Sequence, residues 1–475
     1  MNALLQIPTR ESRPRWHLID PDHPGVPATV DEAAGPATDA RGRPVPRASS
    51  NAVRTGIRVL TRGADTFLAD VERLGDVVAY PFPGRPGPSV VISNPAHIKS
   101  LLAEPDLAPS ATSFSPLRPI IGPDSVLTAI GDRHRRQRAL LMPQFHGKSV
   151  ANYTEAIERA TAHRIDTLPV GTPIRMSRIG QSITLDVIMS GIFGVADPST
   201  ASPAEHRLRQ AVLRLLFWST RSAAANLVQL VNLGRPEPSL PLRLILRPVD
   251  RSIQEVVDER RRSGGEGHDI LSILLSARDE AGVALSDSEI RDELLTLLLA
   301  GHETTANTIA WTFERLVRHP QIYARARKAA IDQDEVYLTA VLNESMRSRP
   351  VIPIFARQVT VPWRFGAYRV EAGSVVLMST VLLHHRADLY ERPFAFDPER
   401  FVGVRPAPNT LMPFGGGNRR CLGANLAMAE LRAVVGEFLR RTELETTSAP
   451  AEPASHRNVT MIPASGGLVT VRAVR

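Results

Sequence analysis

Residues 414–423 read Phe-Gly-Gly-Gly-Asn-Arg-Arg-Cys-Leu-Gly and contain the only cysteine of the 475-residue chain. Glycine has no Cβ and tolerates positive φ, so this backbone can pass close beneath a flat ligand and direct N–H groups at one sulfur atom. Arg419 could pair with a carboxylate on such a ligand. A lone cysteine more often fills a core, so a buried hydrophobe and a metal-binding thiolate are both open interpretations of Cys421.

The stretch resembles the haem-binding loop of the cytochrome P450 family, whose pattern is F-x-x-G-x-R-x-C-x-G. Phe414, Gly417, Arg419, Cys421 and Gly423 occupy its five fixed positions. A cysteine thiolate on haem iron favours cleavage of an O–O bond. The resemblance therefore implies haem b, iron protoporphyrin IX, as cofactor, with Cys421 as the iron ligand and Arg419 among the residues that bind the haem.

A long helix is predicted from Ser286 to about Val317. Residues 286–289 read Ser-Asp-Ser-Glu, the pattern of a capping box, and His-Pro follows at 319–320. In its middle, residues 300–305 read Ala-Gly-His-Glu-Thr-Thr, a polar group inside an apolar helix. A core threonine beside a solvent-facing glutamate would explain this segment; so would a function that needs these polar groups.

The functional interpretation is a local opening of the helix. The Thr304 hydroxyl can bond the carbonyl of Ala300, four residues back, which loosens the hydrogen-bond ladder and admits water. We expect Gly301 to leave room above a metal. The segment resembles the family pattern A/G-G-x-D/E-T-T/S, and this resemblance implies that Glu303 and Thr304 are the catalytic acid–alcohol pair that relays protons during O2 activation.

Glu344 and Arg347 lie one helical turn apart, a spacing that is common on solvated helix faces. Arg400 lies in the stretch 393–401, Pro-Phe-Ala-Phe-Asp-Pro-Glu-Arg-Phe, which resembles the family segment whose arginine completes a buried Glu–Arg–Arg network. The resemblance implies a structural role for the three residues.

Residues 131–138, Gly-Asp-Arg-His-Arg-Arg-Gln-Arg, are strongly basic, which could indicate a solvated helix or a nucleic-acid contact. His134 and Arg138 share one helix face, and the resemblance implies that they bind a haem propionate. It places Arg357, in the stretch 353–357, in a similar role. Arg135 and Arg136 point elsewhere and could contact an acidic electron donor.

The whole chain is predicted to fold as a mainly α protein with small β-sheets, with a single large domain over residues 56–475. Short apolar runs at 89–92, 368–370 and 374–377 predict strands. Residues 1–55 mix proline, arginine and small residues without apolar periodicity, which predicts an extended or disordered arm.

Composition excludes several classes of protein. One cysteine rules out an internal disulfide and a multi-cysteine zinc or iron–sulfur site. The net charge of +8 is spread along the chain, which argues against nucleic acid. No apolar run of about 18 residues predicts a membrane span, and the N-terminus is too short and too soon broken by proline for a signal peptide. We expect a cytoplasmic monomer.

Together these motifs indicate a haem-thiolate monooxygenase that inserts one oxygen atom from O2 into an apolar organic substrate. Electrons would come from a ferredoxin or flavodoxin with its NAD(P)H reductase. Peroxide-driven enzymes, isomerases and dehydratases share the fold but generally lack the acid–alcohol pair. A nucleic-acid-binding protein remains the alternative from another class. The apolar residues expected near the substrate, each equally consistent with ordinary core, are Phe114, Leu117, Leu216, Phe217, Val351, Ile352, Ile354 and Phe355.

Overall fold

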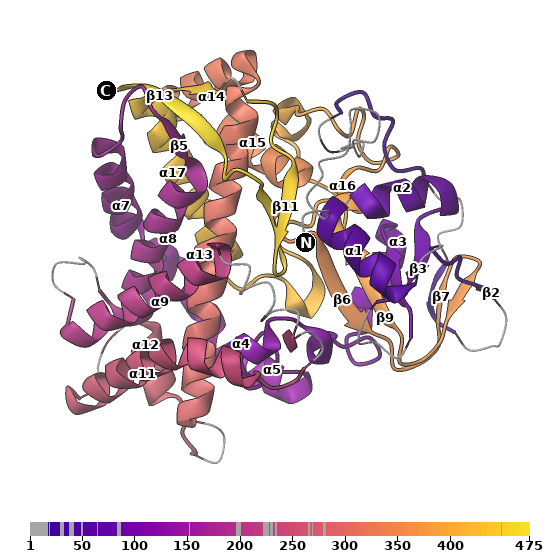
Figure 1. Ribbon diagram of the computed structural model, residues 1–475, viewed down its shortest axis with the longest axis horizontal. Coiled ribbons are helices and arrows are strands. Elements are labelled where there is room, and N and C mark those ends of the chain that lie inside the picture. The colour runs from indigo at the N-terminus through magenta and orange to yellow at the C-terminus, as the bar shows by residue number, and fades with distance from the viewer. Residues whose placement is uncertain are drawn as a thin grey trace, which may run out of the picture.

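The computed structural model shows a mainly helical protein that carries several small sheets (Figure 1). It describes residues 18, 20–28, 33–37, 42–48, 51–63, 65–82, 87–151, 153–195, 201–221, 228, 231, 232, 235–264, 267, 269–278, 282–447 and 449–475. The predicted class, mainly α with small β-sheets, is confirmed.

Along the chain, long helices of the core are separated by shorter helices and turns. Their bounds are α1 Ala52–Arg62, α2 Asp65–Leu74, α3 Pro95–Ala103, α4 Arg118–Ile121, α5 Gly131–Leu141, α6 Lys148–Ala151, α7 Thr154–Asp166, α8 Met176–Phe193, α9 Pro203–Arg221, α11 Leu240–Arg262, α12 Ile270–Ser276, α13 Asp287–Val317, α14 Pro320–Asp332, α15 Glu335–Ser348, α16 Thr380–His384 and α17 Ala424–Arg441. Short 3-10 turns are η3 Thr112–Phe114, η4 Met142–Phe145, η6 Pro398–Phe401 and η7 Gly417–Arg419.

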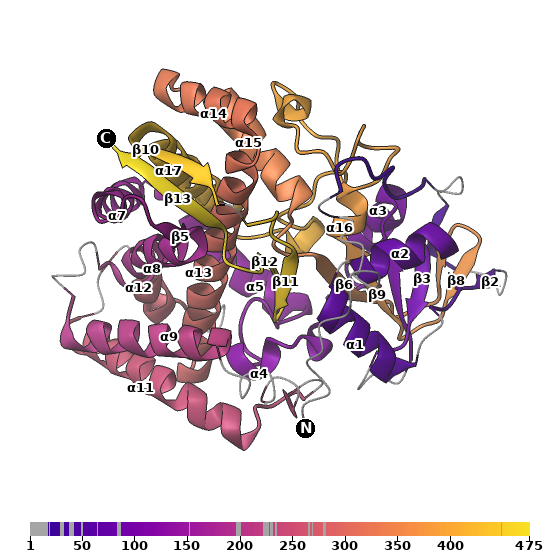
Figure 2. The same cartoon turned by 45° about the horizontal axis from the view of Figure 1, so that its top comes forward.

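Helix α13 is the spine of the helical part. It begins as predicted: the Ser286 side chain accepts from the Glu289 N–H, and the Glu289 side chain accepts from the Ser286 N–H. Helix α8 packs along it so closely that a Cβ on Gly180 would lie 2.9 Å from the Cα of Ala306. Helices α7, α8, α9, α11 and α12 gather on one side of α13 in both ribbon views (Figures 1 and 2).

The sheets lie mainly on the other side of α13 (Figure 2). Their strands are β1 Ala34–Pro36, β2 Arg43–Pro44, β3 Val77–Tyr80, β4 Ser89–Ile92, β5 Pro173–Arg175, β6 Ile354–Gln358, β7 Trp363–Phe365, β8 Tyr368–Val370, β9 Val375–Ser379, β10 Thr442–Thr446, β11 Ala454–Arg457, β12 Thr460–Pro463 and β13 Leu468–Val474. They form sheets of order β1-β7-β8-β2, β3-β4-β9-β6, β10-β13-β5 and β11-β12. The three strands expected from the sequence are confirmed in β4, β8 and β9.

The sheet β3-β4-β9-β6 positions one of the predicted site residues. Strand β4 runs parallel to β9, with Ser89 opposite Val375, and β6 is antiparallel to β9. This register sets Arg357 opposite the buried Val376. Arg357 is therefore held by a strand at the edge of this sheet rather than by a loop.

The described parts of the N-terminal arm run along the domain in an extended form. Strand β1 pairs with β7 and β2 with β8, and Val26 forms a bridge with Arg386. The boundary at residue 55 stays a prediction, and residues 1–17 lie outside the described residues. In the parts of the chain that the structure describes, no helix combines the length and apolarity that crossing a membrane requires.

Candidate functional site

The glycine-rich loop is a closed turn that ends at the start of α17. The Cys421 N–H donates to the Phe414 carbonyl at 2.8 Å, which joins the two ends of the loop. Gly415 and Gly417 have φ of 67° and 62°, values that residues with a Cβ rarely adopt. A Cβ on Gly416 would lie 2.8 Å from the Leu102 side chain. Glycine is required at these positions because the turn is tight and packs directly against α3.

The Cys421 side chain lies deep in the protein but still has free surface. Burial raises the pKa of the thiol above its ordinary value, while a backbone hydrogen bond from Gly423 and the charges of Arg420 and Arg138 act in the opposite direction. The residue is nevertheless exposed. An exposed side chain is not a packed core residue, so the interpretation of Cys421 as a buried hydrophobe is wrong.

Four bases gather beside this loop. Arg419, in η7, donates to the carbonyls of Val126 at 3.1 Å and of Ala129. Arg357, only 3% exposed, donates to the Asn418 side chain at 3.4 Å, and its Nε has no hydrogen-bond partner.

The charges of these basic residues lower one another's pKa values. Burial, followed by the charges of Arg419, Arg138 and Arg357, lowers the pKa of His134 to about 4. Burial and then the neighbouring Arg357 and Arg138 lower the pKa of Arg419 to about 10. In the described parts of the chain, no ion pair joins Arg138, Arg357 or Arg419 to an acidic residue. A buried cluster of like charges of this kind is complementary to a ligand that carries more than one negative charge.

The predicted polar site on α13 has the expected local geometry at Thr304. Its hydroxyl donates to the Ala300 carbonyl at 2.7 Å, as the sequence predicted. Thr308 repeats this bond to the Thr304 carbonyl at 3.0 Å. The helix backbone around Thr304 therefore carries additional hydrogen bonds from side-chain hydroxyls.

The expected role of Gly301 is wrong. A Cβ on Gly301 would lie 2.6 Å from Cδ1 of Ile188. Gly301 is small because α8 crosses α13 at this point, so its missing side chain makes room for a neighbouring helix rather than for a metal.

Glu303 has a partner that the sequence did not predict. Arg457, at the end of β11, donates from Nη1 to Glu303 Oε1 at 2.6 Å. The two side chains are 21% and 16% exposed. The expected solvent-facing glutamate is instead half-buried in an ion pair, and no local pattern near residue 457 could have revealed it.

The predicted Glu–Arg–Arg network is confirmed. Arg347 donates to both carboxylate oxygens of Glu344, at 2.6 and 2.8 Å, and neither side chain is exposed. Arg400 Nε lies 3.2 Å from Glu344 Oε2. Arg347 also donates to the carbonyls of His384 and Pro393, both at 2.7 Å, and to that of Ala395 at 3.1 Å, so the network joins α15 to the segment before the glycine-rich loop.

The structure thus groups the predicted site residues into two sets. His134, Arg138, Arg357 and Arg419 lie together beside Cys421, while Glu303 and Thr304 lie on α13. Hydrogen bonds and ion pairs among the described residues do not connect the two sets.

The apolar residues expected near the substrate have mixed outcomes. Leu216 and Val351 are buried, and Leu216 belongs to the core around α13. Ile354 and Phe355 are half-buried on β6. The side chains of Phe114 and Phe217 lie outside the described residues.

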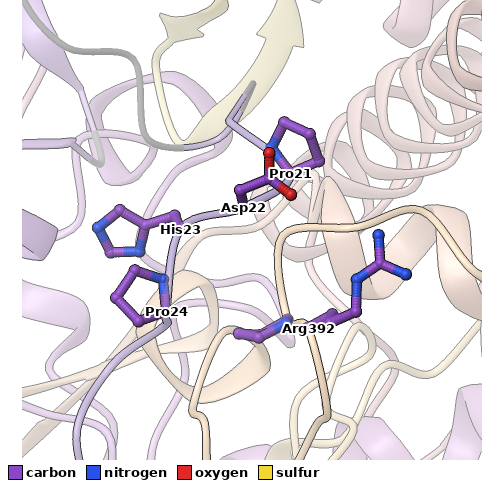
Figure 3. Close-up of a pocket in the computed structure, with 6 residues that line it drawn as sticks. Pro21, Asp22, His23, Pro24 and Arg392 are labelled. Atoms are coloured by element: carbon purple, nitrogen blue, oxygen red, sulfur yellow. The ribbon is translucent and has the colours of Figure 1, made fainter.

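A separate pocket of about 230 Å³ lies in the N-terminal arm (Figure 3). It is lined by Pro21, Asp22, His23, Pro24, Arg392 and Pro393. The side chain of Arg392 points away from that of His23 (Figure 3), and His23 contacts Glu72 at 2.5 Å. None of the predicted site residues lines this pocket.

Comparison with known proteins agrees with the geometry. The profile of the family described as "Cytochrome P450" matches residues 73–471. A Mycobacterium tuberculosis protein named "Putative cytochrome P450 137" is 36% identical over 439 residues, covering 91% of each chain. A Mycobacterium bovis protein named "Putative cytochrome P450 135B1" is 35% identical over 451 residues, covering 91% of this chain and 92% of its own. The chain belongs to the cytochrome P450 family.

Proposed function

We propose that this enzyme inserts one oxygen atom from O2 into an apolar organic substrate, by hydroxylation or epoxidation, with haem b held by Cys421. Membership of the family already implies the monooxygenase class, a haem cofactor, O2 and a redox partner. The observation that carries the finer proposal is the accessible thiol of Cys421 beside four bases that have no acidic partner among the described residues.

The fit between these residues and haem rests on charge and on shape. Haem b carries two propionates, and the cluster of His134, Arg138, Arg357 and Arg419 could offset both charges. The exposed side chain of Cys421 leaves surface against which a flat ring would lie. When bound, the haem would supply the redox chemistry of O2 activation through its thiolate-ligated iron.

The protein itself would control the ligand and the protons. Gly423 donates a backbone hydrogen bond to Cys421 and, with Arg420 and Arg138, favours the thiolate form. Burial lowers the pKa of His134 to about 4, and its imidazole would bind a propionate as a hydrogen-bond donor. Glu303 and Thr304 would relay protons, with the acid supplying the proton that the hydroxyl passes on.

The expected electron donor is an acidic ferredoxin or flavodoxin with its NAD(P)H reductase. Arg136 and Arg420 are exposed, and the charge of Arg420 reaches the thiol of Cys421. Arg135 is tied to Asp132 and lies 3.6 Å from Asp106, so Arg136 and Arg420 are the better candidates for docking. Docking of this kind weakens with salt, so turnover that is insensitive to ionic strength would contradict it.

An isotope experiment tests the reaction. A panel of terpenoid, steroid and fatty acyl compounds is incubated under 18O2 with the enzyme, a ferredoxin, its reductase and NADPH. We expect a product that contains a single 18O atom, and a much lower yield of it from Thr304→Ala. Arg472→Ala is the matched control, because Arg472 forms an exposed pair with Glu445 away from these residues. A product whose added oxygen atom comes from water would contradict the proposal. So would a yield of product from Thr304→Ala equal to that of wild type.

A further inference from the structure

The ion pair between Glu303 and Arg457 joins two elements that are far apart in the sequence. Glu303 lies in the middle of α13, and Arg457 is the last residue of β11, 154 positions later. Arg457 Nη1 lies 2.6 Å from Glu303 Oε1, and in the described structure neither charged group forms another ion pair. The conformation of the Glu303 side chain therefore depends on where the β11–β12 hairpin holds Arg457.

The hairpin is firmly placed. The Trp311 indole of α13 donates to the Met461 carbonyl at 3.2 Å, and the Met461 N–H donates to the Val351 carbonyl at 2.7 Å. The residue before Arg457 is also closely packed, since a Cβ on Gly63 would lie 2.5 Å from Nε2 of His456. Contacts with α13, with Val351 and with Gly63 thus fix the hairpin that carries Arg457.

The pair turns Glu303 away from the hydroxyl it is proposed to serve. Consecutive residues on an α-helix point about 100° apart, because the helix has 3.6 residues per turn. Thr304 directs its hydroxyl at the Ala300 carbonyl, and no hydrogen bond among the described residues joins it to the Glu303 carboxylate. In this structure the Glu303 carboxylate therefore bonds Arg457 and not the Thr304 hydroxyl.

We propose that Arg457 is a positioning residue that keeps Glu303 at the hairpin and thereby restrains proton delivery to Thr304. This proposal rests on the proposed function of Glu303 as the acid of the relay. Both side chains retain partial exposure, so Glu303 can take a proton from water at the edge of the hairpin. After it turns, that proton would pass to the Thr304 oxygen as the Thr304 hydroxyl gives its own to the dioxygen that electrons from the redox partner reduce.

Displacement of β11 and β12 would move Arg457 with them and free the carboxylate. Without Arg457 the acid is free at all times, so protons and electrons are consumed faster even with no organic substrate present. Partly exposed ion pairs are weak, so we expect the loss of Arg457 to change the rate of NADPH oxidation by about two- to fivefold rather than to switch it on or off.

The test measures O2-dependent NADPH oxidation with a ferredoxin and its reductase, in H2O and D2O, with no organic substrate added. We expect Arg457→Ala to raise this rate about threefold, and Arg457→Met, which keeps the side-chain length, to do the same. Arg457→Lys keeps the charge and should stay within twofold of wild type. Arg472→Ala, which removes another arginine from an ion pair, should match wild type.

A double substitution shows whether Arg457 acts through Glu303. In the Glu303→Gln background, Arg457→Ala should add no further change. The reduced CO-bound spectrum and the affinity for imidazole, a probe of the haem pocket, should stay within twofold of wild type in every variant. A crystal structure of Arg457→Ala should show the Glu303 carboxylate turned away from the hairpin, a readout that needs no activity.

The outcomes separate this proposal from the function it rests on. If Glu303→Gln matches wild type in rate and solvent isotope effect, Glu303 is not the acid of the relay and both ideas fail. If Glu303→Gln differs but Arg457→Ala matches wild type, or if the effect of Arg457→Ala persists in the Glu303→Gln background, only the role of Arg457 is overturned. A Glu303 side chain that stays at the hairpin in Arg457→Ala also overturns it.

Discussion

Arg347 donates two parallel hydrogen bonds to Glu344, from Nε to Oε2 at 2.6 Å and from Nη2 to Oε1 at 2.8 Å. Both side chains are buried. Charged pairs this deep are costly to break, because the surviving partner is left buried and unpaired. The carboxylate also accepts the Asp397 N–H at 2.8 Å. Helix α15 is thereby joined to the segment that leads into the glycine-rich loop.

Glu344→Ala should therefore abolish haem incorporation and lower the free energy of unfolding by about 3–5 kcal/mol. Haem content of the purified protein and denaturant unfolding would measure both effects. Glu335→Ala serves as control, because Glu335 forms a mostly exposed contact at 3.6 Å with Arg432 and should change stability by about 0.5 kcal/mol or less. Normal holoprotein from Glu344→Ala would refute the structural role.

Arg357→Met should change the apoprotein and the holoprotein in opposite directions. Arg357 is buried, burial lowers its pKa to about 10, and its Nε has no hydrogen-bond partner. Replacing an unpaired buried charge by an apolar side chain of similar length should stabilise the apoprotein by about 1–2 kcal/mol. Removing a propionate partner should instead speed haem loss.

The two effects can be measured by denaturant unfolding of the apoprotein and by transfer of haem to an excess of a haem-scavenging apoprotein. Arg325→Met, at an exposed pair with Glu399, is the control. A variant that loses stability in both forms would show that Arg357 is structural rather than a propionate ligand.

Buried histidines should make the protein acid-labile. Burial lowers the pKa of His302 and His456 to about 4 and that of His384 to about 3. Between pH 6.5 and 4 the unfolded chain binds protons that the folded chain does not, so the free energy of unfolding must fall as pH falls. Each fully shifted histidine contributes up to about 1.4 kcal/mol per pH unit.

Unfolding of the apoprotein at a series of pH values measures this slope. His456→Leu should reduce it by about 1 kcal/mol per pH unit, whereas the exposed His206→Leu should not. Equal slopes in wild type and His456→Leu would show that His456 is protonated in the folded state.

Glu430 should have the opposite pH dependence. Burial raises the pKa of this carboxyl on α17 to about 8, and its Oε1 has no hydrogen-bond partner. Between pH 4.5 and 8 the folded chain keeps a proton that the unfolded chain has lost, so stability falls as pH rises. Glu430→Gln should match wild type near pH 5 and exceed it at pH 8 by about 3–4 kcal/mol.

Glu445→Gln, at an exposed position, controls for the loss of one negative charge. Thermal unfolding of the apoproteins at pH 5 and pH 8 would suffice. A difference between Glu430→Gln and wild type that is the same at both pH values would mean that Glu430 does not change its charge on unfolding.

Much of the site could be predicted because its chemistry is local in sequence. The cap at Ser286, the bond from Thr304 to Ala300 and the turn around Cys421 each depend on residues within a few positions. Their geometry follows from helix and turn rules that act over one or two turns of chain.

The long-range partners could not be predicted. Arg457 meets Glu303 across 154 positions and Asn418 meets Arg357 across 61, pairings that only the tertiary fold creates. Gly301 shows the same limit: the motif specifies a small residue, but only packing shows that Ile188 of α8 is the neighbour that requires it. Sequence patterns identify side-chain types, whereas contacts between elements set their orientation.

The most direct test of the central claim is the spectrum of the reduced, CO-bound protein, recorded for wild type and for Cys421→Ser. Because thiolate ligation sets the electronic structure of the haem, wild type should show the red-shifted Soret band of a haem-thiolate protein, and Cys421→Ser should lose it. A colourless wild-type protein, or a thiolate-type band that survives in Cys421→Ser, would contradict the assignment of Cys421 as the iron ligand.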